Sequence, residues 1–208
     1  MRENIKIRLL QSMLEEVTKK YDYFIAMQNE KMKHTFEMAV KDTLTGLYNR
    51  QYLDEYSKQA LGRVERYENI LVLIFIDLDN FKYVNDYFGH NEGDNVLRKI
   101  AQIFQKTFRS YDIVVRYGGD EFIVLIEDKH YEEDVIKSIL KQFVKRVEES
   151  LKEFKLSASY GCAIAPNETK DINRLIELAD ERMYLQKGNK KKRNKKRGGE
   201  KALRLKTI

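Results

Sequence analysis

Two adjacent carboxylates, Asp120 and Glu121, follow a Gly-Gly pair in the run 116–122, which lies between apolar stretches at 113–115 and 123–126. A Gly-Gly pair in this setting predicts a β-hairpin, because glycine adopts the positive φ of a tight turn without strain. Glycines also let a phosphate-bearing ligand approach the backbone, and paired carboxylates can hold a hard cation such as Mg²⁺. The run therefore predicts a site for a metal and a phosphate.

Another acid, Asp77, closes the apolar run 70–77, whose continuous hydrophobicity is typical of a central strand covered on both faces. If this strand neighbours the hairpin, Asp77 and Asp120 meet at one end of the sheet. Like charges brought together there repel unless a cation lies between them. The alternative for Asp77 alone is a cap on the turn at 80–85, and the presence of both acids favours a shared Mg²⁺.

Five segments in order along the chain resemble the GGDEF domain, the catalytic domain of diguanylate cyclases, which condense two GTP into cyclic di-GMP. The resemblance implies an α+β fold with a palm-like mixed β-sheet flanked by helices, as in nucleotidyl cyclases. The segments span the chain from Asp42 to Lys187, and five matches in the right order and spacing make a chance resemblance very improbable. They lie at 42–50, 77–82, 85–94, 116–122 and 179–187.

The resemblance implies a reaction in which the 3′ hydroxyl of one GTP attacks the α-phosphorus of the other and pyrophosphate leaves, twice over. It assigns Asp77, Asp120 and the backbone carbonyl of Leu78 as ligands of Mg²⁺, with Mn²⁺ as the alternative metal. Asp120 is also the implied proton acceptor, Lys82 the implied stabiliser of the transition state, and Glu121 an assistant at the metal.

For the base, the resemblance implies that Asn85 and Asp94 recognise guanine, with His90 nearby. An amide and a carboxylate together supply the donor and acceptors that a guanine edge needs, so GTP is expected over ATP. The alternative is a polar loop over 85–94 that caps a helix at Asn95.

For the phosphates, Gly118 and Gly119 are expected to allow close approach of the backbone, and Lys187 corresponds to a triphosphate-binding lysine. Beyond Lys187 the match weakens, and either Lys191 or Arg193 takes the place of a phosphate-binding arginine.

Arg109 and Asp112 precede the hairpin at the spacing of the family's inhibitory product site. Arginine can pair with a phosphate through two donors, while aspartate accepts from a guanine edge. The resemblance thus implies binding of cyclic di-GMP and product inhibition, and the alternative is a surface ion pair.

Three regions follow from the pattern: an N-terminal helix at 1–41, a catalytic domain at 42–189 and a basic tail at 190–208. Apolar residues at three- and four-residue spacing, from Ile7 to Phe24, place one stripe on the first helix. A homodimeric coiled coil is favoured over packing of this stripe on the following domain. The remaining elements expected are helices at 50–67, 95–108, 132–154 and 171–186, and strands at 70–77 and 155–165.

The net charge of +6 is uneven, because residues 187–208 hold eleven of the 39 basic residues and one of the 33 acids. A disordered soluble tail is favoured over one that binds nucleic acid or an anionic membrane. The longest apolar stretch, 70–76, is far shorter than the roughly 20 residues of a spanning helix, so a cytoplasmic location is expected. The single Cys162 excludes an internal disulfide and a cysteine metal site.

Two functions compete: a dimeric diguanylate cyclase and a catalytically silent sensor that binds cyclic di-GMP. Because the acids at 77, 120 and 121 are all present, the enzyme is favoured.

Overall fold

The computed structural model describes residues 2–130 and 132–205, and the side chains of all of these except Glu3, Lys191 and residues 193–205. The chain divides into two compact units, Met1–Lys41 and Asp42–Ile208. Helix α1 (Arg2–Val40) makes up the first unit, and the second holds one sheet and the other described helices. Among the described residues, no helix is both long and apolar enough to cross a membrane.

Helix α1 is the long N-terminal helix that the apolar spacing predicts, and this prediction is confirmed. Its stripe is exposed: Leu10, Leu14, Val17 and Phe24 are between 54% and 68% exposed. Side chains at this spacing lie on one side of a helix, and their apolar area remains in water until a second helix covers it.

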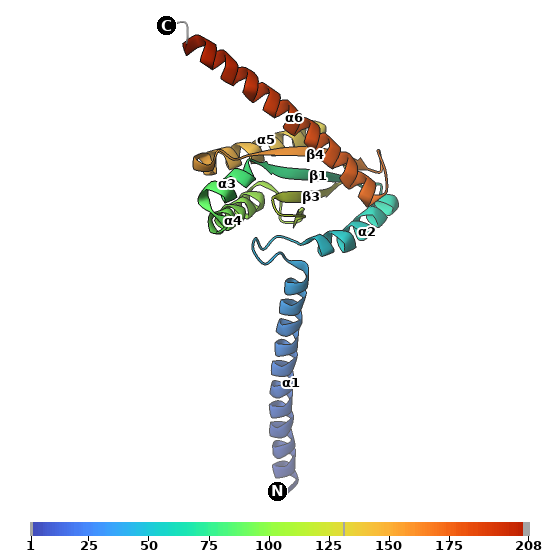
Figure 1. The fold of residues 1–208 in the computed structure, drawn as a ribbon. Coiled ribbons are helices and arrows are strands. Elements are labelled where there is room, and N and C mark those ends of the chain that lie inside the picture. The colour runs from blue at the N-terminus through green and yellow to red at the C-terminus, as the bar shows by residue number, and fades with distance from the viewer. Residues whose placement is uncertain (1, 131, 206–208) are drawn as a thin grey trace. The chain divides into compact units, whose positions relative to one another are not determined.

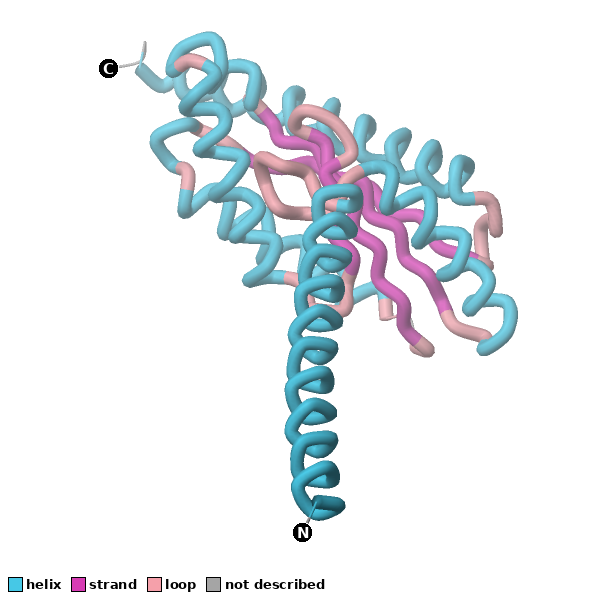
Figure 2. Tube along the Cα trace, turned by 90° about the horizontal axis from the view of Figure 1, so that it is seen from below, coloured by secondary structure: helices cyan, strands magenta, loops and turns pink. Residues whose placement is uncertain are grey.

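The second unit is built around a four-stranded sheet in the order β2-β3-β1-β4. The strands are β1 (Ile70–Asp79), β2 (Ile113–Arg116), β3 (Glu121–Asp128) and β4 (Ser157–Ala165). Figure 2 shows these strands side by side between the helices. Strand β1 is buried from Leu71 to Leu78, as a central strand covered on both faces should be.

Helices cover both faces of this sheet (Figure 1). Alternate residues of β1 point to opposite faces, so Leu73 packs in one apolar cluster and Ile76 in the other. The first cluster includes side chains of α2 (Arg50–Tyr67) and α6 (Ile172–Leu205), and the second those of α4 (His90–Thr107) and α5 (Glu133–Ser150).

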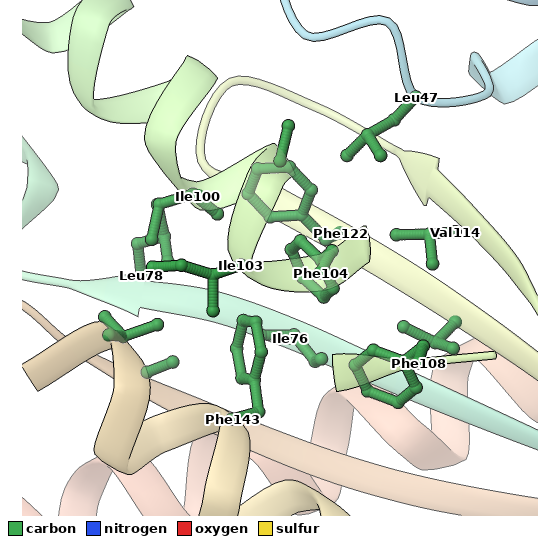
Figure 3. Packing of buried hydrophobic residues seen from close by; sticks show 14 of the residues in the cluster. Leu47, Ile76, Leu78, Ile100, Ile103, Phe104, Phe108, Val114, Phe122 and Phe143 are labelled. Carbon is green, nitrogen blue, oxygen red and sulfur yellow. The ribbon is translucent and has the colours of Figure 1, made fainter. Parts of the chain in front are cut away.

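The second cluster is centred on aromatic rings, which Figure 3 shows close together. The ring centroids of Phe104 and Phe143 are 4.4 Å apart, and those of Phe104 and Phe122 are 5.0 Å apart. Since Phe122 is the residue after Glu121 on β3, this packing fixes the position of the strand end that carries the acids.

The predicted α+β class with flanking helices is confirmed, and three details differ. The sheet was expected to be mixed, but all its strand pairings are antiparallel. The parallel bridge between Tyr48 and Val115 is an isolated contact and not part of a strand pair. The region 80–94, for which no helix was expected, holds helix α3 (Phe81–Phe88), because Phe81, Val84 and Phe88 recur at helical spacing, and α4 begins there at His90 instead of near Asn95. Helix α6 continues to Leu205 instead of ending near Gln186.

Candidate active site

The predicted acids meet at the ends of β1 and β3. In the antiparallel register Asp77 lies opposite Glu121, and the backbone N–H of Leu78 donates to the carbonyl of Asp120 at 3.2 Å. The antiparallel pairing explains this meeting, because it brings the C-terminal end of β1 to the N-terminal end of β3. Asp77 is only 8% exposed, so its charge is held in a largely buried position.

The electrostatics of the cluster show negative charge crowded together. Burial, and next the charge of Asp77, raise the pKa of Asp120 above its usual range. Burial, then Asp77 and Asp120, raise the pKa of Glu121 in the same direction. A cation placed among these oxygens would relieve both effects.

One cation already contacts the cluster. Lys187 on α6 donates from Nζ to Oδ1 of Asp77 at 2.5 Å. Burial lowers the pKa of Lys187, but the hydrogen bond and charge of Asp77 raise it by more, so the net shift is upward. The predicted triphosphate-binding lysine is thus charged and lies beside the predicted metal ligands.

The Gly-Gly turn between β2 and β3 differs from its prediction. Neither Gly118 nor Gly119 adopts a positive φ, so the turn does not use the conformation for which glycine was expected. At position 118, glycine instead avoids a steric contact, because a Cβ built there would lie 2.8 Å from Oε2 of Glu121. Glycine leaves room for the carboxylate beside the turn.

Residues outside the predicted site hold this turn in place. The guanidinium of Arg116 donates to the carbonyl of Gly119 at 3.0 and 3.2 Å and to Asp42 at 3.2 Å. Asp42 also accepts from the backbone and hydroxyl of Thr45. The segment that begins at Asp42 therefore anchors the turn that carries Asp120.

A cavity of about 460 Å³ lies beside the acids. Lys82, Asp120 and Lys187 all line it, so the structure brings three of the predicted residues to one space. Asn80 has φ of 71° just before α3, a conformation that asparagine tolerates better than most residues. The segment 78–82, which includes the start of α3, lines the same cavity, and the N–H groups at a helix start suit an anion.

The predicted guanine-binding residues lie on α3 and α4, outside the lining of this cavity. Asn85 is on α3, and His90 and Asp94 are on α4, which follows after Gly89 at φ of 84°. A Cβ at Gly93 would lie 2.0 Å from Oδ1 of Asn85, so only glycine allows the amide its position. The close approach of the two helices thus sets where the Asn85 amide lies.

A separate cavity of about 240 Å³ is lined by both residues of the predicted inhibitory site. Asp112 is 8% exposed, accepts from the backbone N–H of Arg109 at 2.8 Å, and has a raised pKa because of burial. Its Oδ1 is buried without a hydrogen-bond partner in the described part of the chain. Arg109 lies 3.7 Å from Asp128, which lines the same cavity.

Sequence reasoning missed several residues that line the larger cavity, among them Asp79 and Lys190. Asp79 had a signal, because it lies two residues after Asp77 and therefore on the same face of β1. Nothing in the sequence distinguishes Lys190 from its neighbours, because it lies within a basic run. The predicted phosphate contacts Lys191 and Arg193 lie outside the described side chains.

The donor set at the strand ends fits a hard divalent cation. Asp77, Asp120 and the carbonyl of Leu78 offer only oxygen atoms, which Mg²⁺ prefers. The described residues contain no group of three or more His, Cys, Asp or Glu side chains arranged to hold a metal. The predicted metal site uses only two such side chains, together with one backbone carbonyl oxygen, and is therefore compatible with the absence of a three-side-chain group among the described residues.

Comparison with known proteins agrees with this site. A family model described as "Diguanylate cyclase, GGDEF domain" matches residues 39–194. Diguanylate cyclase DosC of Escherichia coli (strain K12) is 38% identical over 152 residues, which are 70% of this chain and 32% of that protein. Diguanylate cyclase DgcS of Shewanella oneidensis is 35% identical over 164 residues, 79% of this chain and 54% of that protein. The chain thus spans between about a third and about half of the length of these relatives.

A solved structure supports the same assignment. The GGDEF domain of DgcB from Caulobacter crescentus, in complex with c-di-GMP, matches with a TM-score of 0.65 at 28% identity. The match covers 73% of this chain and 91% of that one. With the family match spanning every predicted acid of the site, the chain belongs to the GGDEF diguanylate cyclase family.

Proposed function

We propose that this chain condenses two GTP into cyclic di-GMP and two pyrophosphates. The observation that carries the proposal is the meeting of Asp77, Asp120 and Glu121 at the ends of β1 and β3, beside a cavity that Lys82 and Lys187 line. Carboxylates next to lysines are what a metal-assisted phosphoryl transfer requires.

Diguanylate cyclases of this family generally depend on a divalent metal. In this chain Asp77, Asp120 and the carbonyl of Leu78 would hold it, with Mg²⁺ as the first choice and Mn²⁺ as the second. When bound, the metal supplies polarisation of the phosphates and acidification of the 3′ hydroxyl.

Side chains of the site provide the other proposed interactions with GTP. Lys187 and Lys82 line the cavity beside the acids, where their charges would offset charge on the phosphates. Asp120 accepts the proton of the 3′ hydroxyl, and Glu121 supports the metal. Asn85 and Asp94 read the guanine edge, which gives GTP its preference over ATP.

The proposed enzyme works as a dimer, because one site holds one GTP and the reaction needs two. The exposed stripe of α1 supports this, since a parallel copy would cover it and raise the effective concentration of the second site. The smaller cavity is the proposed inhibitory site, where Arg109 pairs with a phosphate of cyclic di-GMP and Asp112 accepts from guanine. The unpartnered Oδ1 of Asp112 supports that role.

The test is turnover by the purified chain with Mg²⁺ and either GTP or ATP, with products separated by chromatography. The proposal expects one cyclic di-GMP and two pyrophosphates per two GTP, and little product from ATP. Equal turnover of the two nucleotides would contradict the roles of Asn85 and Asp94. Binding of cyclic di-GMP without any turnover would favour the sensor.

A further inference from the structure

Lys190, three residues after Lys187 on α6, extends into the cavity beside the acids. Its Nζ donates to Oδ2 of Asp79 at 3.1 Å and to the carbonyl of Ala158 at 2.5 Å. The side chain is 34% exposed, so it is partly enclosed. The ammonium is therefore held at a defined place between β1 and β4.

The carboxylate of Asp79, which accepts from Lys190, is itself held in place. Asp79 is 14% exposed in its side chain, and both its oxygens accept from the hydroxyl of Ser159 at 2.9 Å. Asp79 belongs to the central strand β1 and Ser159 to the edge strand β4, which pairs with it. A lysine is normally a flexible group, but here two rigid strands determine where its charge lies.

The ammonium group has three N–H donors, and the two contacts use two of them. The third is available to a ligand in the cavity without breaking either contact. Lys82, Lys187 and Lys190 all line this one cavity of about 460 Å³. Asp79, Asp120 and Glu148 line the same cavity. Such a lining suits a triphosphate bound together with a divalent cation, because the lysines match the phosphates and the carboxylates match the cation.

We propose that Lys190 is a further substrate-binding residue, which donates a hydrogen bond to the triphosphate of the nucleotide in this cavity. Asp79 and Ala158 position its ammonium beforehand, so little side-chain freedom is lost when the phosphate binds. This inference rests on the proposed function, because it takes GTP to be the ligand of the cavity.

The test compares nucleotides that differ in phosphate number, using Lys190→Met in the full chain. Binding of 3′-deoxy-GTP, which lacks the attacking hydroxyl, and of GMP is measured by calorimetry with Mg²⁺ present. A charge-assisted hydrogen bond lost to the triphosphate should weaken 3′-deoxy-GTP binding by roughly tenfold or more. GMP binding should change by less than about twofold, because GMP lacks the phosphates that the inference assigns to Lys190.

Two further variants serve as controls. Lys192→Met removes the same charge two residues later from an exposed side chain, and it should leave both affinities within about twofold of wild type. Lys190→Arg keeps the charge and should restore most of the triphosphate affinity. Thermal unfolding of each variant confirms that the chain is folded.

Unchanged 3′-deoxy-GTP binding by Lys190→Met would overturn the inference, and turnover of GTP by the wild-type chain would leave the proposed function standing. Equal losses of affinity for 3′-deoxy-GTP and GMP, together with a lower melting temperature, would show that Lys190 stabilises the fold instead of binding phosphate. This result would also overturn the inference. If the wild-type chain binds no 3′-deoxy-GTP, the inference falls together with the proposed function.

Discussion

At the scale of the residue, the acids of the site depend on neighbours that carry no chemistry of their own. Gly118 leaves the space that the carboxylate of Glu121 occupies, and Arg116 joins the turn to Asp42. These residues place Asp120 and Glu121 without contributing a group to the reaction.

Gly118→Ala should lower kcat by about tenfold or more while leaving the fold intact, because the new methyl group displaces the Glu121 carboxylate. Gly62→Ala is the matched control, since a Cβ there meets no atom within 4 Å and alanine favours a helix. Steady-state kinetics and thermal unfolding of both variants check this. Normal kcat in Gly118→Ala would show that the position of Glu121 is not critical.

Asp42→Asn should cost about 1 kcal/mol of unfolding free energy near neutral pH, because it weakens the anchor to Arg116. Burial raises the pKa of Asp42, but its hydrogen bonds to Thr45 and Arg116 outweigh this and leave the pKa below its ordinary value of 3.8. A depressed pKa means that this stabilisation is present above pH 3.8 and is lost as the pH falls through the folded value.

Denaturant unfolding of wild type and Asp42→Asn between pH 7 and pH 3 measures this difference. The gap between the two proteins should be constant above about pH 5 and should shrink at lower pH. A gap that grows toward low pH would refute the role given to the Asp42 carboxylate.

At the scale of the element, the sequence shows the strands and long helices well, because continuous or helical spacing of apolar residues is a strong signal. Strand β1, with its run from Leu71 to Leu78, is the clearest example. Helix α3 was missed, since eight residues give too few turns for the spacing to outweigh the polar residues around Asn85. The antiparallel meeting of Asp77 with Glu121 also depends on pairing between strands far apart in the chain, which local pattern does not encode.

The smaller cavity, lined by Arg109 and Asp112 and by residues of β1, β3 and α5, yields a prediction about inhibition. Asp128 lies 3.7 Å from Arg109 and adds negative charge to the cavity proposed to bind dianionic cyclic di-GMP. Asp128→Asn should therefore lower the cyclic di-GMP concentration for half inhibition by about two- to fivefold, since repulsion is reduced.

Initial rates at increasing product concentration measure that change, with Arg109→Ala as the opposite control, which should weaken inhibition strongly. If Asp128→Asn weakens inhibition as well, the ion pair with Arg109 helps to form the product site instead of competing with it.

At the scale of the whole molecule, the proposed reaction joins two GTP held at two sites, so two copies of the chain are proposed to meet. Helix α1 carries an exposed apolar stripe that a second helix could cover. That stripe has the spacing of a coiled-coil seam through Phe24, and its burial against a second helix would stabilise a dimer.

Leu14→Lys in α1 should weaken dimerisation, because it puts a charge in the proposed seam. Specific activity at low protein concentration should fall by about tenfold or more and should recover partly at high concentration. Lys19→Met, on the side of the helix opposite the stripe, is the control, and analytical ultracentrifugation reports the association of each variant. A monomeric and fully active Leu14→Lys would separate dimerisation by α1 from catalysis.

The most direct test of the central claim is the rate of cyclic di-GMP formation from GTP and Mg²⁺, measured over a wide range of protein concentrations. The proposed dimeric mechanism predicts product whose specific activity rises with protein concentration until the dimer is saturated. It also predicts no product from Asp120→Asn at any of these concentrations. A folded wild-type chain, cleared of bound cyclic di-GMP, that forms no product at any concentration would contradict it.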